Sequence, residues 1–133
     1  MSTQTRFDLD GLTRSIEQHD HDYRMALYAD HADAEILDPT DATKPVRLSG
    51  KAAIGRWLTT RDATARHHRV RDAQLVHDQL TFADECRNTD GASSVYLSTA
   101  TIWRGQIVNE SIKREPIREC RLQARGRERA LAR

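Results

Sequence analysis

The sequence predicts an α+β fold in which helices from its first half cover one face of a curved antiparallel meander formed by its second half. Three observations lead to this class. Apolar residues recur at helical spacing up to about residue 64, and beyond residue 66 the pattern becomes extended. Short turn signals separate the extended segments. Helices followed by strands indicate an α+β domain whose helices pack on the sheet.

Two helices are expected before residue 30. The apolar residues at helical spacing are Leu9, Leu12, Ile16, Tyr23 and Leu27. Asp8 or Asp10 is available to cap the first helix, because a short acid accepts from the free N–H groups of the first turn. The polar run at 19–22 predicts a break, after which a second helix covers about 22–29.

The middle of the chain predicts a short strand at 34–38, a polar loop at 39–45 and a small strand at 46–48. Ser49 is then the expected cap of a helix that ends near residue 64. Its shared face carries Ile54, Trp57, Leu58 and Arg61.

Four strands are expected in the second half, at 70–76, 80–86, 95–103 and 107–112. The turn signals between them are 77–79, 89–91 and 104–105. Asp90-Gly91 is the strongest signal, because glycine accepts the positive φ of a tight hairpin. Short turns between successive strands make an antiparallel meander.

The order of these elements resembles the nuclear transport factor 2-like superfamily, in its SnoaL-like and ketosteroid-isomerase-like branch. The resemblance rests on LYADHADAEILD at 27–38, which ends on an acid before Pro39, and on SGKAAI at 49–54. The segment IWRGQIVNESIKRE at 102–115 resembles the last hairpin of that family. The layout of the expected helices and strands extends the resemblance over about residues 8–115. The resemblance implies a cone-shaped sheet that encloses a ligand pocket.

Length and charge indicate one domain at 1–116 followed by a basic tail at 117–133. The chain has 133 residues and a formal net charge of +1, which gives no global field that would attract nucleic acid. The tail contains six arginines against two glutamates and few large apolar residues. A solvated tail is therefore expected, and a basic patch for an anionic partner is the alternative.

Two cysteines, Cys86 and Cys120, form neither a metal-ligand spacing nor a disulfide framework. Cys86 is expected to be a small buried residue of a strand. The sequence has no apolar stretch of transmembrane length and no signal-peptide pattern at its start. We expect a cytoplasmic location and no membrane partner.

Asp38 is the first candidate catalytic residue. Its position resembles that of the general base of ketosteroid isomerases, and partial desolvation beneath a helix layer would make it a better proton acceptor. The alternative is an acid that turns the chain at Pro39. The isomerase hydrogen-bond donors would fall near Leu12, which cannot donate, and near Thr99, which lacks the required acidity. The resemblance therefore does not extend to steroid isomerisation.

His68 is the second candidate catalytic residue. Related dehydratases place a histidine at a comparable strand start, and imidazole titrates where proton transfer at neutral pH is useful. His67 and His68 are adjacent in a strand, so at most one of them enters the pocket. The alternative is a solvated histidine at a helix-to-strand junction.

His19 shares the apolar stripe of Ile16 and Tyr23, so it is a candidate for the pocket wall or for a boundary position. His19 and His21 diverge by about 200° on a helix and cannot chelate one ion together. The sequence also lacks a Cys-x-x-Cys or His-Glu-x-x-His pattern. We therefore expect no metal site and no cofactor.

Polar residues at alternating strand positions form a further group of candidate ligand contacts. These residues are Asp84, Thr99, Glu110 and Arg114. If their faces point inward, the charges of Asp38, Asp84, Glu110 and Arg114 would compensate one another, because lone burial is too costly. An arginine between carboxylates also resembles the epoxide hydrolases of this fold. The alternative is that these residues lie on a solvent-facing sheet surface or in a dimer interface. A shift of one residue in strand register would move each side chain to the opposite face of the sheet.

The aromatic residues available for a cavity wall are Tyr23, Trp57, Phe82 and Trp103. An aromatic residue at helical spacing usually belongs to the core. Trp57 occupies a position that resembles a pocket aromatic of the isomerases, and its indole N–H requires a partner.

The leading functional hypothesis is a cofactor-independent acid–base enzyme of isomerase, cyclase, dehydratase or hydrolase type, acting on a small hydrophobic molecule. In this hypothesis Asp38 is the base and His68 is a second proton carrier. Thr99 orients the ligand, and Trp57 forms an apolar wall of the pocket. One placed acid–base group contributes typically about 10²–10⁴-fold. The alternatives are a non-catalytic binding module in the same cone and a structural domain that dimerises through the outer face of its sheet.

Overall fold

A computed structural model of the chain describes residues 6–39 and 44–116. The predicted basic tail and Cys120 lie outside the described residues. The elements are α1 (Leu9–Glu17), α2 (His21–Ala26), β1 (Tyr28–Leu37), β2 (Val46–Ser49), α3 (Lys51–Asp62), β3 (Ala65–Val76), β4 (Gln79–Asn88), β5 (Ser93–Trp103) and β6 (Gln106–Pro116).

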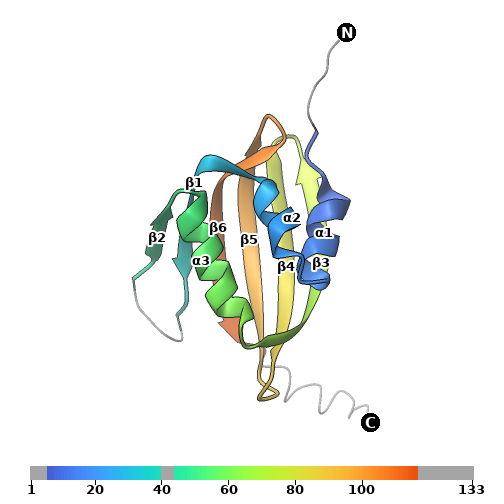
Figure 1. The fold of residues 1–133 in the computed structure, drawn as a ribbon, viewed down its shortest axis with the longest axis vertical. Coiled ribbons are helices and arrows are strands. Elements are labelled where there is room, and N and C mark those ends of the chain that lie inside the picture. The colour runs from blue at the N-terminus through green and yellow to red at the C-terminus, as the bar shows by residue number, and fades with distance from the viewer. Residues whose placement is uncertain (1–5, 40–43, 117–133) are drawn as a thin grey trace.

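The six strands form one sheet in the order β2-β1-β6-β5-β4-β3. Strands β3 to β6 pair antiparallel with their sequence neighbours, which confirms the predicted meander. The sheet is mixed, because β1 pairs parallel with β6 and antiparallel with β2. Figure 1 shows all three helices on one face of the curved sheet, as predicted for the α+β class.

The core lies between the helices and the inner face of the sheet. From the helices, Leu12, Ile16, Ile54 and Leu58 are buried. From the sheet, the buried apolar residues include Leu80, Phe82, Ala100, Ile102, Ile107 and Ile112. Side chains alternate across a strand, so the residues between these positions face away from the helices. The other described face of the sheet carries Leu97 and Trp103, which are exposed.

The break between the first two helices is where the polar run predicted it. Asp8 caps α1 by accepting from the N–H of Gly11 at 2.9 Å. Asp20 caps α2 by accepting from the N–H of Tyr23 at 3.1 Å. Between the two helices, His19 has a φ of 58°, a left-handed conformation that ends the first helix.

The first strand is longer than predicted, because it starts at Tyr28 and the second helix ends at Ala26. The run at 29–34 is rich in alanine and aspartate, which are poor strand formers, so its local signal is weak. Pairing with β6 overrides that preference. The register shifts between Tyr28 and Asp33, and this irregularity also disturbs the alternation expected of a strand.

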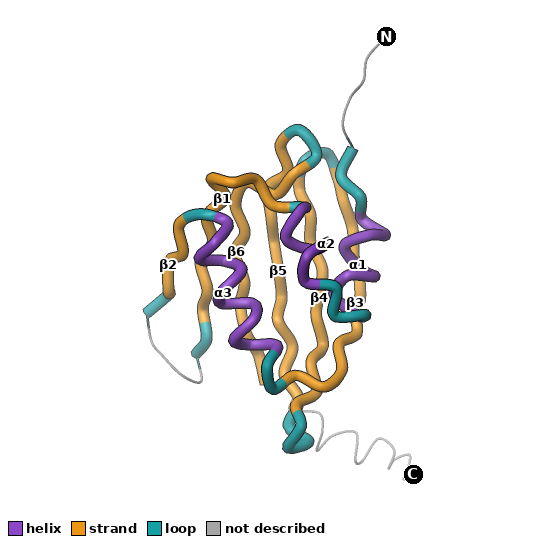
Figure 2. The backbone as a smooth tube through the Cα atoms, viewed as in Figure 1, coloured by secondary structure: helices purple, strands orange, loops and turns teal. Residues whose placement is uncertain are grey.

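Gly50, and not Ser49, is the residue that caps α3. Its φ of 91° and ψ of 150° are accessible essentially only to glycine, and its N–H donates to the Ala32 carbonyl at 2.7 Å. Figure 2 shows the tight connection from β2 into α3 at this point. None of the helices in the described ranges has the length and apolar character needed to cross a bilayer.

Gly50→Ala is expected to destabilise the protein by about 1–3 kcal/mol. An added Cβ meets nothing within 4 Å, so the cost comes from the backbone alone. Urea unfolding measures the change, with Gly55→Ala as the matched control. A Cβ at Gly55 meets Met25 Cε at 3.4 Å, an ordinary contact inside a helix, so this variant should lose no stability. An unchanged midpoint for Gly50→Ala would contradict the assigned strain.

Candidate functional site

A buried acid, Asp84 of β4, organises the charged centre of the domain. It is 1% exposed and lies on the inner face of the sheet between the buried residues Phe82 and Cys86. Its Oδ2 accepts from Arg61 Nη2 at 3.1 Å, and its Oδ1 lies 2.8 Å from His68 Nδ1. Each oxygen of this carboxylate is therefore paired with a different basic group.

Asp62, the last residue of α3, provides a second acid in the same cluster. Its Oδ1 accepts from Arg61 Nε at 2.9 Å and lies 3.3 Å from His68 Nε2. The contact with His68 has an ion-pair distance but not the direction of a hydrogen bond. The imidazole of His68 thus lies between two carboxylates. We name the group formed by Arg61, Asp62, His68 and Asp84 the charge cluster.

The charge cluster strongly favours the protonated form of His68. Burial alone would lower its pKa, but the contacts with Asp62, Asp84 and Cys86 outweigh burial and raise the pKa to about 11. Burial also disfavours ionised Asp62 and Asp84, yet His68 and Arg61 hold both carboxyl pKa values below the ordinary range. Two cations then balance two anions, which is the condition under which charges tolerate burial.

Three buried donor atoms of this region lie close enough to share a metal ion. They belong to His68, Asp84 and Cys86, and all lie within 4.8 Å of one another. The surroundings disfavour a cation, however. Arg61 contacts Asp84 directly, His68 favours its protonated form, and burial raises the pKa of the Cys86 thiol. The donor set fits a hydrogen-bonded cluster better than a metal centre.

Trp57 of α3 covers the guanidinium of Arg61. The Arg61 carbon Cζ lies 5.6 Å from the Trp57 ring centroid and 4.7 Å from that of Tyr96. The two rings meet edge to face at 6.0 Å. These contacts are cation–π interactions, which stabilise a cation that has been removed from water. Trp57 therefore supports the charge cluster.

Glu110 of β6 forms a second buried polar group. It accepts hydrogen bonds from the hydroxyl of Tyr28 and from Ser98 Oγ. Burial, followed by the charge of Glu110, raises the pKa of Tyr28 above its ordinary value, so this phenol is neutral. Tyr28 also interacts with Arg24. Glu110 is thus in the interior, as the inward alternative predicted.

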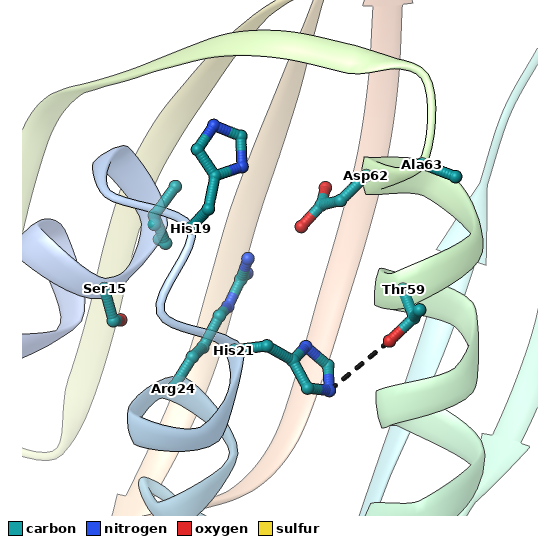
Figure 3. A pocket seen from close by; sticks show the side chains of 8 residues that line it. Ser15, His19, His21, Arg24, Thr59, Asp62 and Ala63 are labelled. Carbon is teal, nitrogen blue, oxygen red and sulfur yellow. Dashed lines mark hydrogen bonds between the residues drawn. The ribbon is translucent and has the colours of Figure 1, made fainter.

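A pocket of about 380 Å³ opens between the first two helices and the end of α3. Its walls are Ser15, Ile16, His19, His21, Arg24, Thr59, Asp62 and Ala63. Figure 3 shows Asp62 facing this space from α3, opposite His19 and Arg24. A volume of this size suits a small molecule. On one side His21 Nε2 lies 3.4 Å from Thr59 Oγ1, a contact between α2 and α3.

The pocket and the charge cluster share a boundary. Asp62 belongs to both, and the ring of His19 packs edge to face against that of His68 with centroids 5.1 Å apart. His68 itself has a side chain only 1% exposed. A ligand in the pocket would therefore contact Asp62 and His19 directly, with His68 immediately behind them.

Asp38 lies at a different place, near the end of β1. Its Oδ2 accepts from Arg114 Nη1 at 2.9 Å, and Arg114 also donates to Ser94 Oγ at 3.1 Å and 3.2 Å. This geometry differs from that of the shielded carboxylate expected for a general base. Asp38 and Arg114 do compensate each other's charge, as the inward alternative required, but neither lines the pocket between α2 and α3.

Three further residues do not contact that pocket in the predicted way. Phe82 is a buried core residue, and Tyr23 is exposed and donates from its hydroxyl to Asp8. Thr99 is exposed between the buried residues Ser98 and Ala100, so it lies on the outer face of the sheet. The prediction that Thr99 orients a ligand within the cone is therefore wrong, because the register places its neighbours on the inner face.

Sequence reasoning missed Arg24, and it gave no chemical role to Arg61 or Asp62. A usable signal was present. Arg24 precedes the buried Leu27 and Tyr28 by three and four residues, and Asp62 follows the buried Leu58 by four. Charged residues on the apolar stripe of a helix point inward and require a partner or a ligand.

Comparisons with family models and with curated proteins gave no match. Solved structures do match. An NTF-2-like protein of unknown function from Burkholderia xenovorans LB400 superposes with a TM-score of 0.68 at 16% identity, over 82% of this chain and 80% of that one. A protein from Shewanella denitrificans OS-217, provisionally classed as a SnoaL-like polyketide cyclase, gives 0.57 at 10% identity, over 79% and 85%.

A third structure was solved with a small ligand. This hypothetical protein from Catenulispora acidiphila DSM 44928 has a ketosteroid isomerase-like fold and is in complex with trimethylamine. It superposes with a TM-score of 0.56 at 13% identity, over 77% of this chain and 81% of that one. The chain therefore has the nuclear transport factor 2-like fold, in the form shared by SnoaL-like and ketosteroid isomerase-like proteins. At these identities the likeness concerns the fold alone, because one fold carries many functions.

Proposed function

We propose that this protein is a cofactor-independent acid–base enzyme that acts on a small, largely apolar molecule in the pocket between α2 and α3. The reaction is of isomerase, cyclase, dehydratase or hydrolase type. The observation that carries the proposal is the position of Asp62, which faces the pocket while contacting both Arg61 and His68.

Asp62 is the proposed base. Its lowered pKa keeps it ionised through mildly acidic conditions, so it is ready to accept a proton, although only weakly basic. A weak base suits a ligand whose C–H or O–H is already acidified by a neighbouring carbonyl group. Arg24 in the same pocket supplies positive charge that would hold a polar or anionic group of the ligand opposite Asp62.

His68 acts in this proposal as a positioning residue. With a pKa of about 11 it holds its proton at neutral pH and is a poor proton carrier there. Its two ring nitrogens instead set Asp62 relative to Asp84. The base role predicted for Asp38 is not retained, because its ion pair with Arg114 lies away from the pocket walls.

Asp62→Asn is expected to lower a proton-transfer rate by about 10²–10⁴-fold. A suitable measurement is NMR of α-proton exchange in D₂O for a panel of cyclic ketones and keto esters, after selection of those that bind. The matched control is Asp38→Asn, which should exchange at the wild-type rate. Loss of exchange in the control variant alone would return the base role to Asp38.

The rival function is a non-catalytic binding module of the same fold. It would be supported if panel compounds bind to the pocket but exchange no faster with the wild-type protein than in buffer. We also propose, as the sequence suggested, a cytoplasmic homodimer formed through the outer face of the sheet. The exposed side chains of Leu97 and Trp103 support that surface.

A further inference from the structure

Arg24 is a buried cation without an acidic partner among the described residues. It is 4% exposed, and its Nε has no hydrogen-bond partner. The ion pairs of the described chain include Arg47, Arg61, Arg71 and Arg114, but not Arg24. A buried guanidinium without an anion is one of the least favourable arrangements in a protein interior.

The nearby polar groups do not neutralise this charge. Tyr28 interacts with Arg24 but is a neutral phenol. Glu110 is occupied by the hydroxyl groups of Tyr28 and Ser98. The charge of Arg24 contributes to the lowered pKa of Asp84, but both oxygens of Asp84 are in direct contact with Arg61 and His68. The described part of the protein therefore supplies no direct counter-ion, and an anion from outside is the partner that would complete the site.

The side chain of Arg24 is directed at the space where such an anion can bind. It lines the pocket of about 380 Å³, and Figure 3 shows it extending from α2 between His19 and Asp62. The planar guanidinium presents several N–H donors in a fork that matches a carboxylate. His21 and Thr59 line the same pocket and add polar groups at its side.

We propose that Arg24 binds the carboxylate of a small hydroxy-monocarboxylate, which defines the ligand class of this pocket. This inference rests on the proposed function for the location of the ligand. Asp62 faces the pocket from the opposite wall, so a second negative charge on the ligand would be repelled there. A hydroxyl group would instead donate to Asp62. Dicarboxylates and phosphate, with more negative charge, are therefore disfavoured.

The probes are 4-hydroxybenzoate, lactate and 3-hydroxybutyrate, each compared with its neutral amide, together with terephthalate as a dicarboxylate and inorganic phosphate. Titration calorimetry or NMR gives the dissociation constants. At least one hydroxy acid should bind at least tenfold more tightly than its amide and than terephthalate or phosphate. Wild-type protein that binds none of the acids, or binds amides equally well, would overturn the inference.

Arg24→Met is expected to weaken binding of the acid about tenfold to a hundredfold, as for a lost hydrogen bond to a charged group. The matched control is Arg56→Met, which removes the same charge from an exposed position on α3. The control should bind within about twofold of wild type, since it lies outside the pocket walls. Equal loss in both variants would mean that net charge alone attracts the acid, and would overturn the assignment to Arg24.

The stability of the variant provides an independent readout. Without ligand, Arg24→Met should unfold at the same or a higher urea concentration than wild type, because an unpaired cation has been removed. Saturating hydroxy acid should raise the wild-type midpoint but not that of the variant. A large destabilisation, with an unchanged response to the acid, would show a structural role instead. If Arg24→Met does not fold, Arg24→Lys replaces it, with weaker binding expected because the fork is lost.

Asp62→Asn separates this inference from the proposed function. That variant should bind the hydroxy acid as tightly as wild type or more tightly, because repulsion is removed, while losing proton exchange. Acid binding without exchange in the wild-type protein would contradict the enzyme and retain the ligand class. Proton exchange that depends on Asp62, in a protein that binds none of the hydroxy acids, would support the enzyme and contradict the ligand class.

Discussion

Replacing Asp84 with asparagine is expected to destabilise the protein by about 3–5 kcal/mol, the range for removing one partner from a buried charged group. The neutral amide would leave Arg61 and His68 in the interior with only Asp62 to balance them. The loss reflects the cost of incompletely compensated buried cations, and not the strength of any single contact. Urea unfolding followed by both fluorescence and circular dichroism measures it.

The neighbouring residue supplies a matched control. Glu85 lies on the other face of the same strand and pairs with Arg71 at 3.0 Å, in a partly exposed ion pair. Glu85→Gln should change stability by less than about 1 kcal/mol, since solvent screens such pairs. Equal effects of the Asp84 and Glu85 substitutions would contradict the view that burial makes the charge cluster critical.

The stability of the protein should fall as the pH rises from about 6.5 towards about 11. His68 has an ordinary pKa of 6.5 and a folded-state pKa raised to about 11 by Asp62, Asp84 and Cys86 against the opposing effect of burial. Between these values the folded state binds one more proton than the unfolded state. The contribution is complete below pH 6.5 and decreases by about 1.4 kcal/mol per pH unit until His68 loses its proton.

Two histidine variants isolate this effect. His68→Gln should remove most of the slope and lower stability at neutral pH, whereas His67→Gln should retain the slope because His67 is exposed. NMR of labelled histidine should also show an imidazolium at His68 at pH 8. A neutral imidazole at that pH would overturn the electrostatic description of the charge cluster.

These two predictions test the same physical feature, a neutral group of four charges, of which Asp62 lines the pocket between α2 and α3. Its balance depends on His68 carrying a proton. A ligand that alters the charge at Asp62 would therefore be coupled to His68, since the two side chains are 3.3 Å apart. Ligand binding in the pocket and protonation in the interior of the cone are thus expected to depend on each other.

Much of the fold could be predicted because its signals are local. The hairpin turns coincide with positive-φ residues, including Gly91 and Arg104-Gly105, and Asp8 caps the first helix as expected. The early part of β1 was missed, since its alanine and aspartate residues become a strand only through pairing with β6. The sequence offers no local signal for that parallel pairing, because the partner strand lies at the other end of the domain sequence.

The candidate site was predictable in part. Inward burial was one of two alternatives for the strand acids, and the register places Asp84 and Glu110 on the inner face. Of the predicted mutual compensation, only the pair of Asp38 and Arg114 forms, because Asp84 pairs with Arg61 and His68. Thr99 was placed on the wrong face by the same one-residue ambiguity. The partners of Asp84 could not be paired from the sequence, because Arg61 arrives from a helix and His68 from another strand.

The sequence alone determined the α+β class, the meander and the approximate bounds of the helices, because periodicity, caps and glycine turns act over a few residues. Tertiary structure decided which charges meet. Whether Asp38 or Asp62 lines the pocket, and which acids lie close to Arg24, depends on packing between elements distant in the chain. Burial makes the contacts between these charges important for the free energy of folding. Charges removed from water must be compensated by neighbours, and the tertiary fold determines which neighbours are present.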